Sequence, residues 1–270
     1  MTRPLILADL DDSLFQTRAK CGDWGEDDLR LMSRLADGSP SGYATPPQQA
    51  LLGWLAHGEL VPVTARARDV LARVDIAQAP AICANGGCIL TADGTPDPAW
   101  HARLTAEARG AEAPAALYPA LTDGLGEEYR HWIVSEDGLD LYLVIKSNVG
   151  DVPALSALAE TLRERLPQGW RIHANGNNLA FLPPWLSKRA AVRYMLDHVR
   201  SQNPGRLVLG IGDSWSDAGF LDLCDLAMIP TQAQLWQHIA RGHEWIDGTH
   251  LTAPTLPRMW PSVSSPPPSR

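Results

Sequence analysis

Four short apolar runs, each ending at a polar residue, constrain the fold of this 270-residue chain more than any other feature. The runs cover residues 4–8, 60–63, 81–84 and 207–211, and the polar residues that end them are Asp9, Thr64, Asn85 and Gly212-Asp213. Apolar runs of this length are typical of strands buried on both faces of a parallel sheet. Helical patterns follow Thr64 and Asp213. The sequence therefore predicts an α/β fold with a doubly wound parallel (Rossmann-like) sheet, which binds ligands beyond the carboxyl ends of its strands.

Two segments depart from this alternation. Residues 18–59 are predicted to be an insertion with two helices, one around Leu29, Met32 and Leu35 and one that opens at Thr45. The second helix has a capping-box spacing from Thr45 to Gln48, with proline at its first position.

The second departure begins near residue 88, where the pattern changes to hairpins and mixed α/β pieces. Strand-like runs at 132–135 and 141–146 precede a helix after Asp151 and a hairpin at 175–177. We expect a discontinuous catalytic core at residues 1–87 and 184–250, with an inserted α+β cap domain at 88–183. Residues 251–270 are rich in proline and serine and are predicted to be disordered.

Composition and charge exclude several classes of protein. Hydrophobic residues make up 45% of the chain and no apolar run approaches the ~18 residues of a membrane span. No signal-peptide cleavage site follows the first residues, so we expect a soluble, cytoplasmic protein without membrane association. The net charge of −8 argues against nucleic-acid binding. The four cysteines lack metal or disulfide spacing, which favours buried thiols.

A group of carboxylates follows the first and last of these strands. Side chains alternate along a strand, so Asp9 and Asp11 should project to the same side. Two carboxylates this close repel unless a divalent cation shares them. Asp213 and Asp217 add negative charge at the same sheet edge. A hard cation with oxygen ligands, Mg²⁺, is the expected cofactor.

Further polar residues lie where they could hold an anion. Lys188 opens a helix that Ser187 could cap, and Thr64 lies at a strand-to-helix junction where free amides can bind a phosphate oxygen. Arg66 is a candidate contact for the substrate phosphate. Asn85 could contact substrate, but Asn-Gly-Gly is also simply a turn signal.

At this point the sequence resembles the phosphatases of the haloacid dehalogenase superfamily. Their four motifs match the segment from Asp9 to Ser13, then Thr64, Lys188, and the segment from Gly212 to Asp217. The resemblance covers residues 1–87 and 184–250. An insertion between the second and third motifs is similar to the subgroup with a large α/β cap, which includes sugar phosphatases and phosphomannomutases.

The resemblance implies a role for each carboxylate. Asp9 would attack phosphorus to form an aspartyl-phosphate, and Asp11 would act as the acid and base. Mg²⁺ would be held by Asp9, the Asp11 backbone carbonyl and Asp213. Asp217 would orient Lys188.

It also implies how the phosphoryl group is bound, through Thr64 and Lys188. One position departs from the subgroup, because Ser216 stands where asparagine commonly precedes the last aspartate. The metal or substrate contacts of that asparagine need not exist in this chain.

Three functional hypotheses follow. The first is a phosphatase acting on a small phosphorylated metabolite, with a sugar phosphate as one candidate. The second keeps the same aspartyl-phosphate but returns the phosphoryl group to the sugar, as a mutase does. The third is a homologue that binds a phosphorylated ligand without turnover. The sequence does not identify the substrate and predicts no oligomeric state.

Overall fold

The computed structural model describes residues 3–242, and these divide into two compact units. The first unit comprises residues 3–63, 74–77 and 192–242, and the second comprises 64–73 and 78–191. The division of the chain into a core at 1–87 and 184–250 and a cap at 88–183 stays a prediction. The predicted disordered tail at 251–270 lies outside the described residues.

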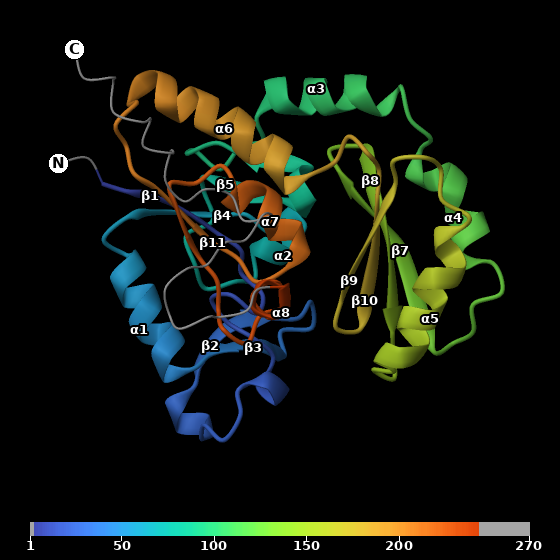
Figure 1. The fold of residues 1–270 in the computed structure, drawn as a ribbon, viewed down its shortest axis with the longest axis horizontal. Helices are drawn as coiled ribbons and strands as arrows, with labels where there is room; N and C mark the ends of the chain where they lie inside the picture. Colours follow the sequence, from blue (N-terminus) through green and yellow to red (C-terminus); the bar gives the residue numbers. More distant parts are fainter. Residues whose placement is uncertain (1–2, 243–270) are drawn as a thin grey trace, which may run out of the picture. The chain divides into compact units, whose positions relative to one another are not determined.

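The first unit is built on a four-stranded parallel sheet with the order β12-β11-β1-β4. Its strands are β1 (Leu5–Ala8), β4 (Glu59–Pro62), β11 (Val208–Ile211) and β12 (Leu226–Met228). All four residues of β1 and all four of β11 are buried, as the apolar runs predict for strands covered on both faces. Helices flank this sheet (Figure 1), and the predicted α/β class is confirmed.

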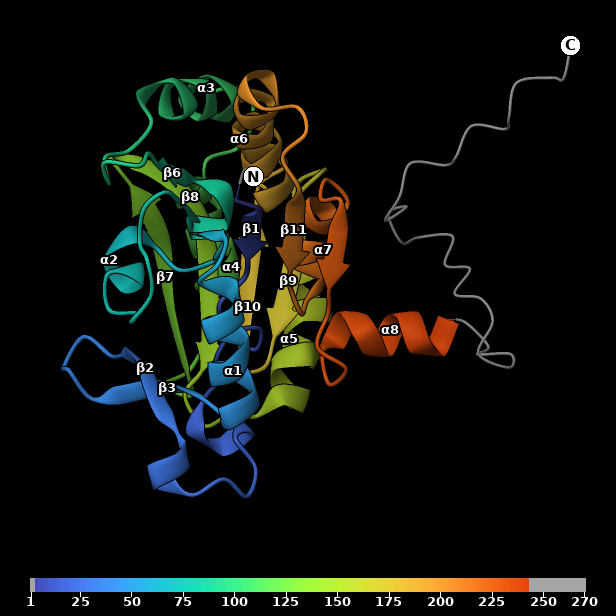
Figure 2. The same ribbon diagram turned by 90° about the vertical axis from the view of Figure 1, so that its left-hand side faces the viewer.

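Four helices include residues of the first unit, namely α1 (Pro46–Leu55), α6 (Lys188–Gln202), α7 (Trp215–Leu221) and α8 (Gln234–Gly242). The predicted start of α1 is confirmed, because the Thr45 backbone N–H donates to Gln48 Oε1 at 3.0 Å. Figure 2 shows α7 beside β11, the strand that precedes it in the chain. Among the described residues, no helix combines the length and the apolar character needed to cross a membrane.

The predicted helix around Leu29, Met32 and Leu35 is wrong. Met32 lies in β2 (Arg30–Arg34), which forms a hairpin with β3 (Pro40–Ala44), and Leu29 and Leu35 flank β2 on either side. Short 3₁₀ turns precede the hairpin at Arg18–Lys20 and Glu26–Asp28. Met32 is buried, but Leu35 is 53% exposed, so the three side chains share no apolar face. The three-residue spacing was too short a signal to outweigh strand pairing, which is decided by residues elsewhere in the chain.

The run at residues 81–84 is a strand, but not a member of the parallel sheet. It forms β5 (Ala81–Cys83), which pairs antiparallel with β6 (Cys88–Leu90) across a 3₁₀ turn at Ala84–Gly86. The Thr64 backbone N–H donates to the Ile82 carbonyl at 2.8 Å, so β5 positions the segment that follows β4 in the chain. The helix predicted after Thr64 is one turn, α2 (Arg68–Leu71).

The second unit contains a four-stranded antiparallel sheet with the order β7-β8-β10-β9. Its strands are β7 (Tyr129–Glu136), β8 (Leu139–Ser147), β9 (Arg171–Asn175) and β10 (Asn178–Leu182), and its helices are α3 (Pro98–Ala108), α4 (Pro114–Thr122) and α5 (Val152–Arg163). The predicted strands at 132–135 and 141–146, the helix after Asp151 and the hairpin at 175–177 are confirmed. Figure 1 shows α4 and α5 on one side of this sheet.

The core of this second unit lies between its sheet and those two helices. Leu155, Ala159 and Leu162 of α5 are buried against Leu143 and Phe181. Burial of each large apolar side chain contributes about 1.5–3 kcal/mol. The Asp151 side chain caps α5 by accepting from the Ala154 backbone N–H at 2.9 Å.

All four cysteines are buried free thiols, as their spacing predicts. Burial raises the pKa of Cys88 and of Cys224 to about 12, and it also raises the pKa of Cys21 and Cys83. A thiol reacts as its thiolate, which is scarce at pH 8 when the pKa is this high.

We therefore expect no rapid reaction of the native protein with Ellman's reagent at pH 8. All four thiols should react once the chain is unfolded in guanidinium. A thiol that reacted within seconds in the native protein would contradict the burial described here.

Candidate active site

Two neighbouring strands deliver the central carboxylates of the first unit. Asp9 directly follows β1, and its backbone N–H donates to the Ile211 carbonyl at 2.9 Å. Asp213 comes two residues after Ile211, the last residue of β11, which pairs with Ala8 of β1. Parallel pairing thus brings two segments about 200 positions apart in the sequence to the same sheet edge.

Three buried carboxylates converge at this edge. Asp9, Asp213 and Asp217 each offer one ligand oxygen, and these three oxygens lie within 4.8 Å of one another. Asp9 is 6% exposed, Asp213 5% and Asp217 0%. Like charges this close repel, and burial removes the water that would screen them. A divalent cation with a preference for oxygen ligands would relieve both costs.

Asp217 has a structural task within this cluster. Its Oδ2 accepts from the backbone N–H groups of Asp213 (3.1 Å) and Ser214 (3.0 Å) and from the Ser214 hydroxyl (2.9 Å). These bonds fold the turn between β11 and α7 and fix the backbone of Asp213. Asp9 and Asp213 are therefore the carboxylates best suited to hold a cation, and Mg²⁺ commonly uses one or two carboxylates.

Ser216, the departure from the superfamily motif, belongs to the same turn. Its hydroxyl lies 2.9 Å from the Ser214 hydroxyl and donates to Asp217 Oδ1 at 3.3 Å. In this chain the residue before the last aspartate thus supports the turn through Ser214 and Asp217.

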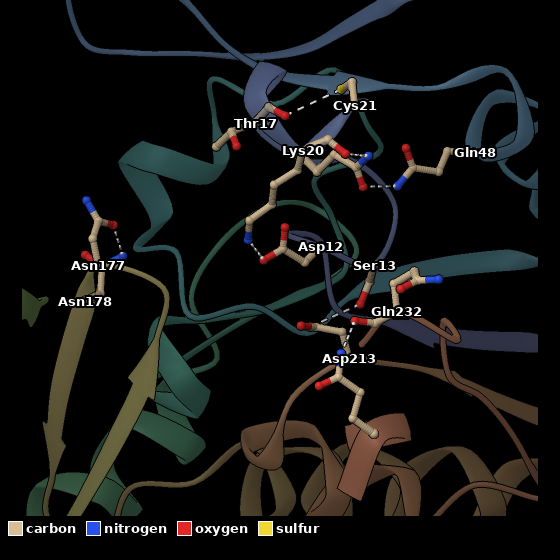
Figure 3. Close-up of polar contacts among 12 residues, drawn as sticks. Asp12, Ser13, Thr17, Lys20, Cys21, Gln48, Asn177, Asn178, Asp213 and Gln232 are labelled. Carbon is tan, nitrogen blue, oxygen red and sulfur yellow. Dashed lines mark hydrogen bonds and ion pairs between the residues drawn. The ribbon is translucent and has the colours of Figure 1, made fainter. Parts of the chain in front are cut away.

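Ser13 is a site residue that the sequence reasoning missed. Its side chain is 3% exposed, and its hydroxyl donates to Asp213 Oδ1 at 3.4 Å, as Figure 3 shows. Ser13 ends the segment that matches the first motif, but the match by itself assigned no role to it.

Asp11 and Asp12 lie in the turn that leaves β1. Asp11 is partly exposed, forms an isolated bridge with Phe15, and does not contribute to the carboxylate cluster. Asp12 adopts a left-handed backbone with φ of 61°, and its carboxylate pairs with Lys20 at 2.5 Å (Figure 3).

The remaining predicted site residues belong to the second unit. Thr64, Asn85 and Lys188 are each 1–3% exposed, whereas Arg66 is partly exposed. Thr64 Oγ1 accepts from the Arg66 backbone N–H at 3.1 Å, and the Asn85 backbone N–H donates to the Thr64 carbonyl at 3.0 Å. Thr64, Arg66 and Asn85 are therefore neighbours.

Lys188 begins α6, as predicted. Ser187 caps this helix, since its hydroxyl accepts from the Ala190 backbone N–H at 3.1 Å. The structure thus groups the predicted residues into two sets. The acidic set, Asp9, Asp11, Asp213 and Asp217, belongs to the first unit, and Thr64, Arg66, Asn85 and Lys188 belong to the second.

A second acidic group, in the second unit, is explained by an arginine. Cys88, Glu136 and Asp137 present ligand atoms within 4.8 Å of one another. Arg68 pairs with Asp137 at 2.8 Å and with Glu136 at 3.5 Å, and its backbone N–H donates to Glu136 at 2.7 Å. The guanidinium supplies the positive charge that this group requires.

Gly212 allows the turn at Asp217 to close. A Cβ on Gly212 would lie 2.5 Å from the Asp217 Cβ. We expect Gly212→Ala to destabilise the protein by about 1–3 kcal/mol, because backbone or side chain must shift to avoid the overlap. Thermal or denaturant unfolding measures this change.

Gly53→Ala is the matched control for that substitution. Gly53 lies inside α1, and a Cβ there meets nothing within 4 Å. The same chemical change should stabilise the protein by up to about 1 kcal/mol, since alanine favours helix. Equal effects of the two substitutions would refute the close contact at Gly212.

The proteins found to be similar to this chain are similar in structure, with low sequence identity. No family model matches the chain, and no curated protein does. The fold is similar to the sucrose-phosphatase from Synechocystis sp. PCC6803, solved in complex with sucrose and phosphate, with a TM-score of 0.55 and 19% identity over 90% of each chain. The C-terminal domain of trehalose-6-phosphate phosphatase from C. albicans matches with a TM-score of 0.47 and 13% identity, over 81% of this chain and 72% of that one.

The chain has the haloacid dehalogenase fold. The resemblance recognised from the four motifs is thus confirmed at the level of the fold. Within this haloacid dehalogenase fold, the first motif follows β1 and the fourth follows β11, two hydrogen-bonded neighbours in the sheet.

Proposed function

We propose that this protein is a magnesium-dependent phosphatase that hydrolyses a small phosphate monoester through an aspartyl-phosphate on Asp9. The convergence of Asp9, Asp213 and Asp217 at one sheet edge carries the proposal, because buried carboxylates this close repel one another and a divalent cation would offset that repulsion. The likeness to a sucrose-phosphatase supports a phosphorylated sugar as the substrate class.

In the first step, a carboxylate oxygen of Asp9 attacks the phosphorus atom and the bond from phosphorus to the alcohol oxygen breaks. Asp11 gives its proton to the departing oxygen, so the alcohol leaves neutral. Asp9 is buried directly after β1, a strand paired on both sides, and this restricts the positions from which its oxygen would attack.

In the second step, water attacks the phosphorus of the aspartyl-phosphate. Asp11, now a carboxylate, takes the proton from this water, and the bond between phosphorus and Asp9 breaks to release inorganic phosphate. Asp11 ends the cycle protonated and Asp9 ends it as a carboxylate, so both are ready for another turnover.

The donor set fits a magnesium ion. The Asp9 and Asp213 carboxylates would hold it together with the Asp11 backbone carbonyl, and Asp217 and Ser13 would orient Asp213. When bound, the ion supplies positive charge against the phosphoryl oxygens.

The second unit would supply the contacts to the phosphoryl group. Thr64 and Lys188 are proposed to bind its oxygens, with Lys188 oriented by Asp217, and Arg66 and Asn85 to contact the substrate. Thr64 is a buried polar residue in the segment that follows β4, and Lys188 is a buried polar residue at the start of α6, which supports this role.

The test is phosphate release from a panel of phosphorylated metabolites. We expect at least one sugar phosphate to be hydrolysed with Mg²⁺ and none in excess EDTA. Release of phosphate that is unaffected by EDTA would contradict the proposal.

A further inference from the structure

The side-chain amide of Asn85 is buried at the turn between β5 and β6. Its Oδ1 and Nδ2 atoms are both buried, and neither makes a hydrogen bond within the part of the chain that the structure describes. A buried donor or acceptor without a partner costs about 1–3 kcal/mol. The unpaired amide thus raises the free energy of the folded protein, and a bound group that hydrogen-bonds to it would remove this cost.

The backbone holds Asn85 in place despite this cost. Asn85 and the preceding Ala84 both have left-handed conformations, with φ of 58° and 50°. The Ala84 backbone N–H donates to the Arg66 carbonyl at 2.7 Å, and Trp100 Nε1 donates to the Gly86 carbonyl at 2.9 Å. These hydrogen bonds fix the backbone of the turn at Asn85 without a contribution from the Asn85 side chain.

The same turn lies against the residue that precedes Lys188. A Cβ on Gly86 would be 2.5 Å from the Ser187 carbonyl oxygen, so the two backbones are in close contact. On the other side, the Asn85 backbone N–H donates a hydrogen bond to the Thr64 carbonyl. Asn85 therefore lies between Thr64 and Lys188, the two residues proposed to hold the phosphoryl group.

Tyr142 of β8 completes this group within the second unit. Its side chain is 4% exposed, and its hydroxyl donates to the Ala65 carbonyl at 2.7 Å. Burial raises the pKa of Tyr142, and the nearby Lys188 charge and Asn85 amide oppose that rise. The amide lies close to this hydroxyl, whose own hydrogen bond is the one to the Ala65 carbonyl.

We propose that the Asn85 amide binds a substrate hydroxyl on the carbon next to the phosphoester carbon, and so selects polyol monophosphates. The assignment rests on the proposed function. A hydroxyl group both donates and accepts, which matches an amide that offers one acceptor and one donor. Tyr142 acts as a positioning residue, because its bond to Ala65 holds the segment that carries Thr64.

The expected selectivity is large because the amide is already desolvated. A buried site built to bond a hydroxyl rejects the analogue that lacks it, since its own polar atoms are then left unpaired. We expect roughly a 100-fold preference or more for the hydroxylated member of a matched pair.

Two pairs of probes test this, and the two members of each pair differ only in this hydroxyl. Glucose 1-phosphate is compared with 2-deoxyglucose 1-phosphate, and glycerol 3-phosphate with 1,3-propanediol monophosphate. The measurement is kcat/KM, or the inhibition constant against a hydrolysed substrate where a probe is not turned over. The wild type should prefer the hydroxylated member of at least one pair.

Asn85→Gly is the decisive variant, because glycine keeps the left-handed backbone and removes the side chain with its amide. The preference should fall to below about 3-fold. The melting temperature should not decrease, since two unpaired polar atoms are lost, whereas a purely structural asparagine would lower it.

Equal values within both pairs for the wild type, or a preference that survives in Asn85→Gly, would overturn the assignment of Asn85. Neither result would affect the proposed phosphatase activity. Conversely, the absence of Mg²⁺-dependent release from every metabolite on the panel would count against the proposed function itself.

Discussion

Asp9→Asn should abolish phosphate release, by roughly 10³-fold or more, while the protein remains folded. The amide has nearly the shape of the carboxylate but cannot form the aspartyl-phosphate. Asp9 also belongs to the buried acidic cluster, so removal of its charge should not destabilise the protein. The measurement is kcat/KM on the best substrate of the panel, with circular dichroism as the folding check.

Asp12→Asn is the matched control for this variant. Asp12 is three residues away, but its carboxylate pairs with Lys20 and its left-handed backbone suits asparagine equally well. We expect activity within about 2-fold of the wild type, because an exposed ion pair contributes at most ~1 kcal/mol. Equal activities of Asp9→Asn and the wild type would end the aspartyl-phosphate proposal.

The products of the same assay separate the two enzymatic hypotheses. Free phosphate from a hexose 1-phosphate identifies a phosphatase. Conversion of that probe into an isomeric hexose phosphate, dependent on Asp9, would identify a mutase with the same nucleophile.

Mg²⁺ should raise the melting temperature of the wild type, even without substrate. The cluster of Asp9, Asp213 and Asp217 is repulsive by itself, and a cation bound only by the folded state stabilises that state. At a Mg²⁺ concentration of about 100 times Kd the gain is about 2.7 kcal/mol, or roughly 5–10 °C. Differential scanning calorimetry across a Mg²⁺ titration measures it.

Asp213→Asn should remove this response. Without Mg²⁺ the variant should melt at or above the wild-type temperature, because one of three repelling charges is gone. Asp12→Asn should keep the full Mg²⁺ response. A Mg²⁺-dependent shift of the same size in Asp213→Asn would show that the ion binds elsewhere.

The apolar runs and their polar ends were enough to predict much of the first unit. Asp9 and Asp213 were assigned to one sheet edge because buried strands of a parallel sheet read as continuous apolar segments. The starts of α1 near Thr45 and of α6 at Lys188 were also predictable, since capping depends on residues within one turn of each other.

Elements with weak local signals were not predictable in this way. The hairpin at β2 and β3 was mistaken for a helix, and residues 81–84 were assigned to the wrong sheet. In both cases the strand's partner lies outside the segment itself, so no periodicity within the segment could identify it.

By itself, the sequence determined the fold class and the acidic residues that follow the first and last predicted strands, because those features depend on local patterns of burial and charge. Only the tertiary structure decided which residues contact these acidic residues. It showed that Asp217 and Ser13 contact Asp213 and that Arg68 forms ion pairs with the second acidic group. It also showed that the Asn85 amide is buried without a hydrogen bond to any residue in 3–242. Hydrogen bonding and burial depend on which distant segments meet, and spacing along the chain does not record that.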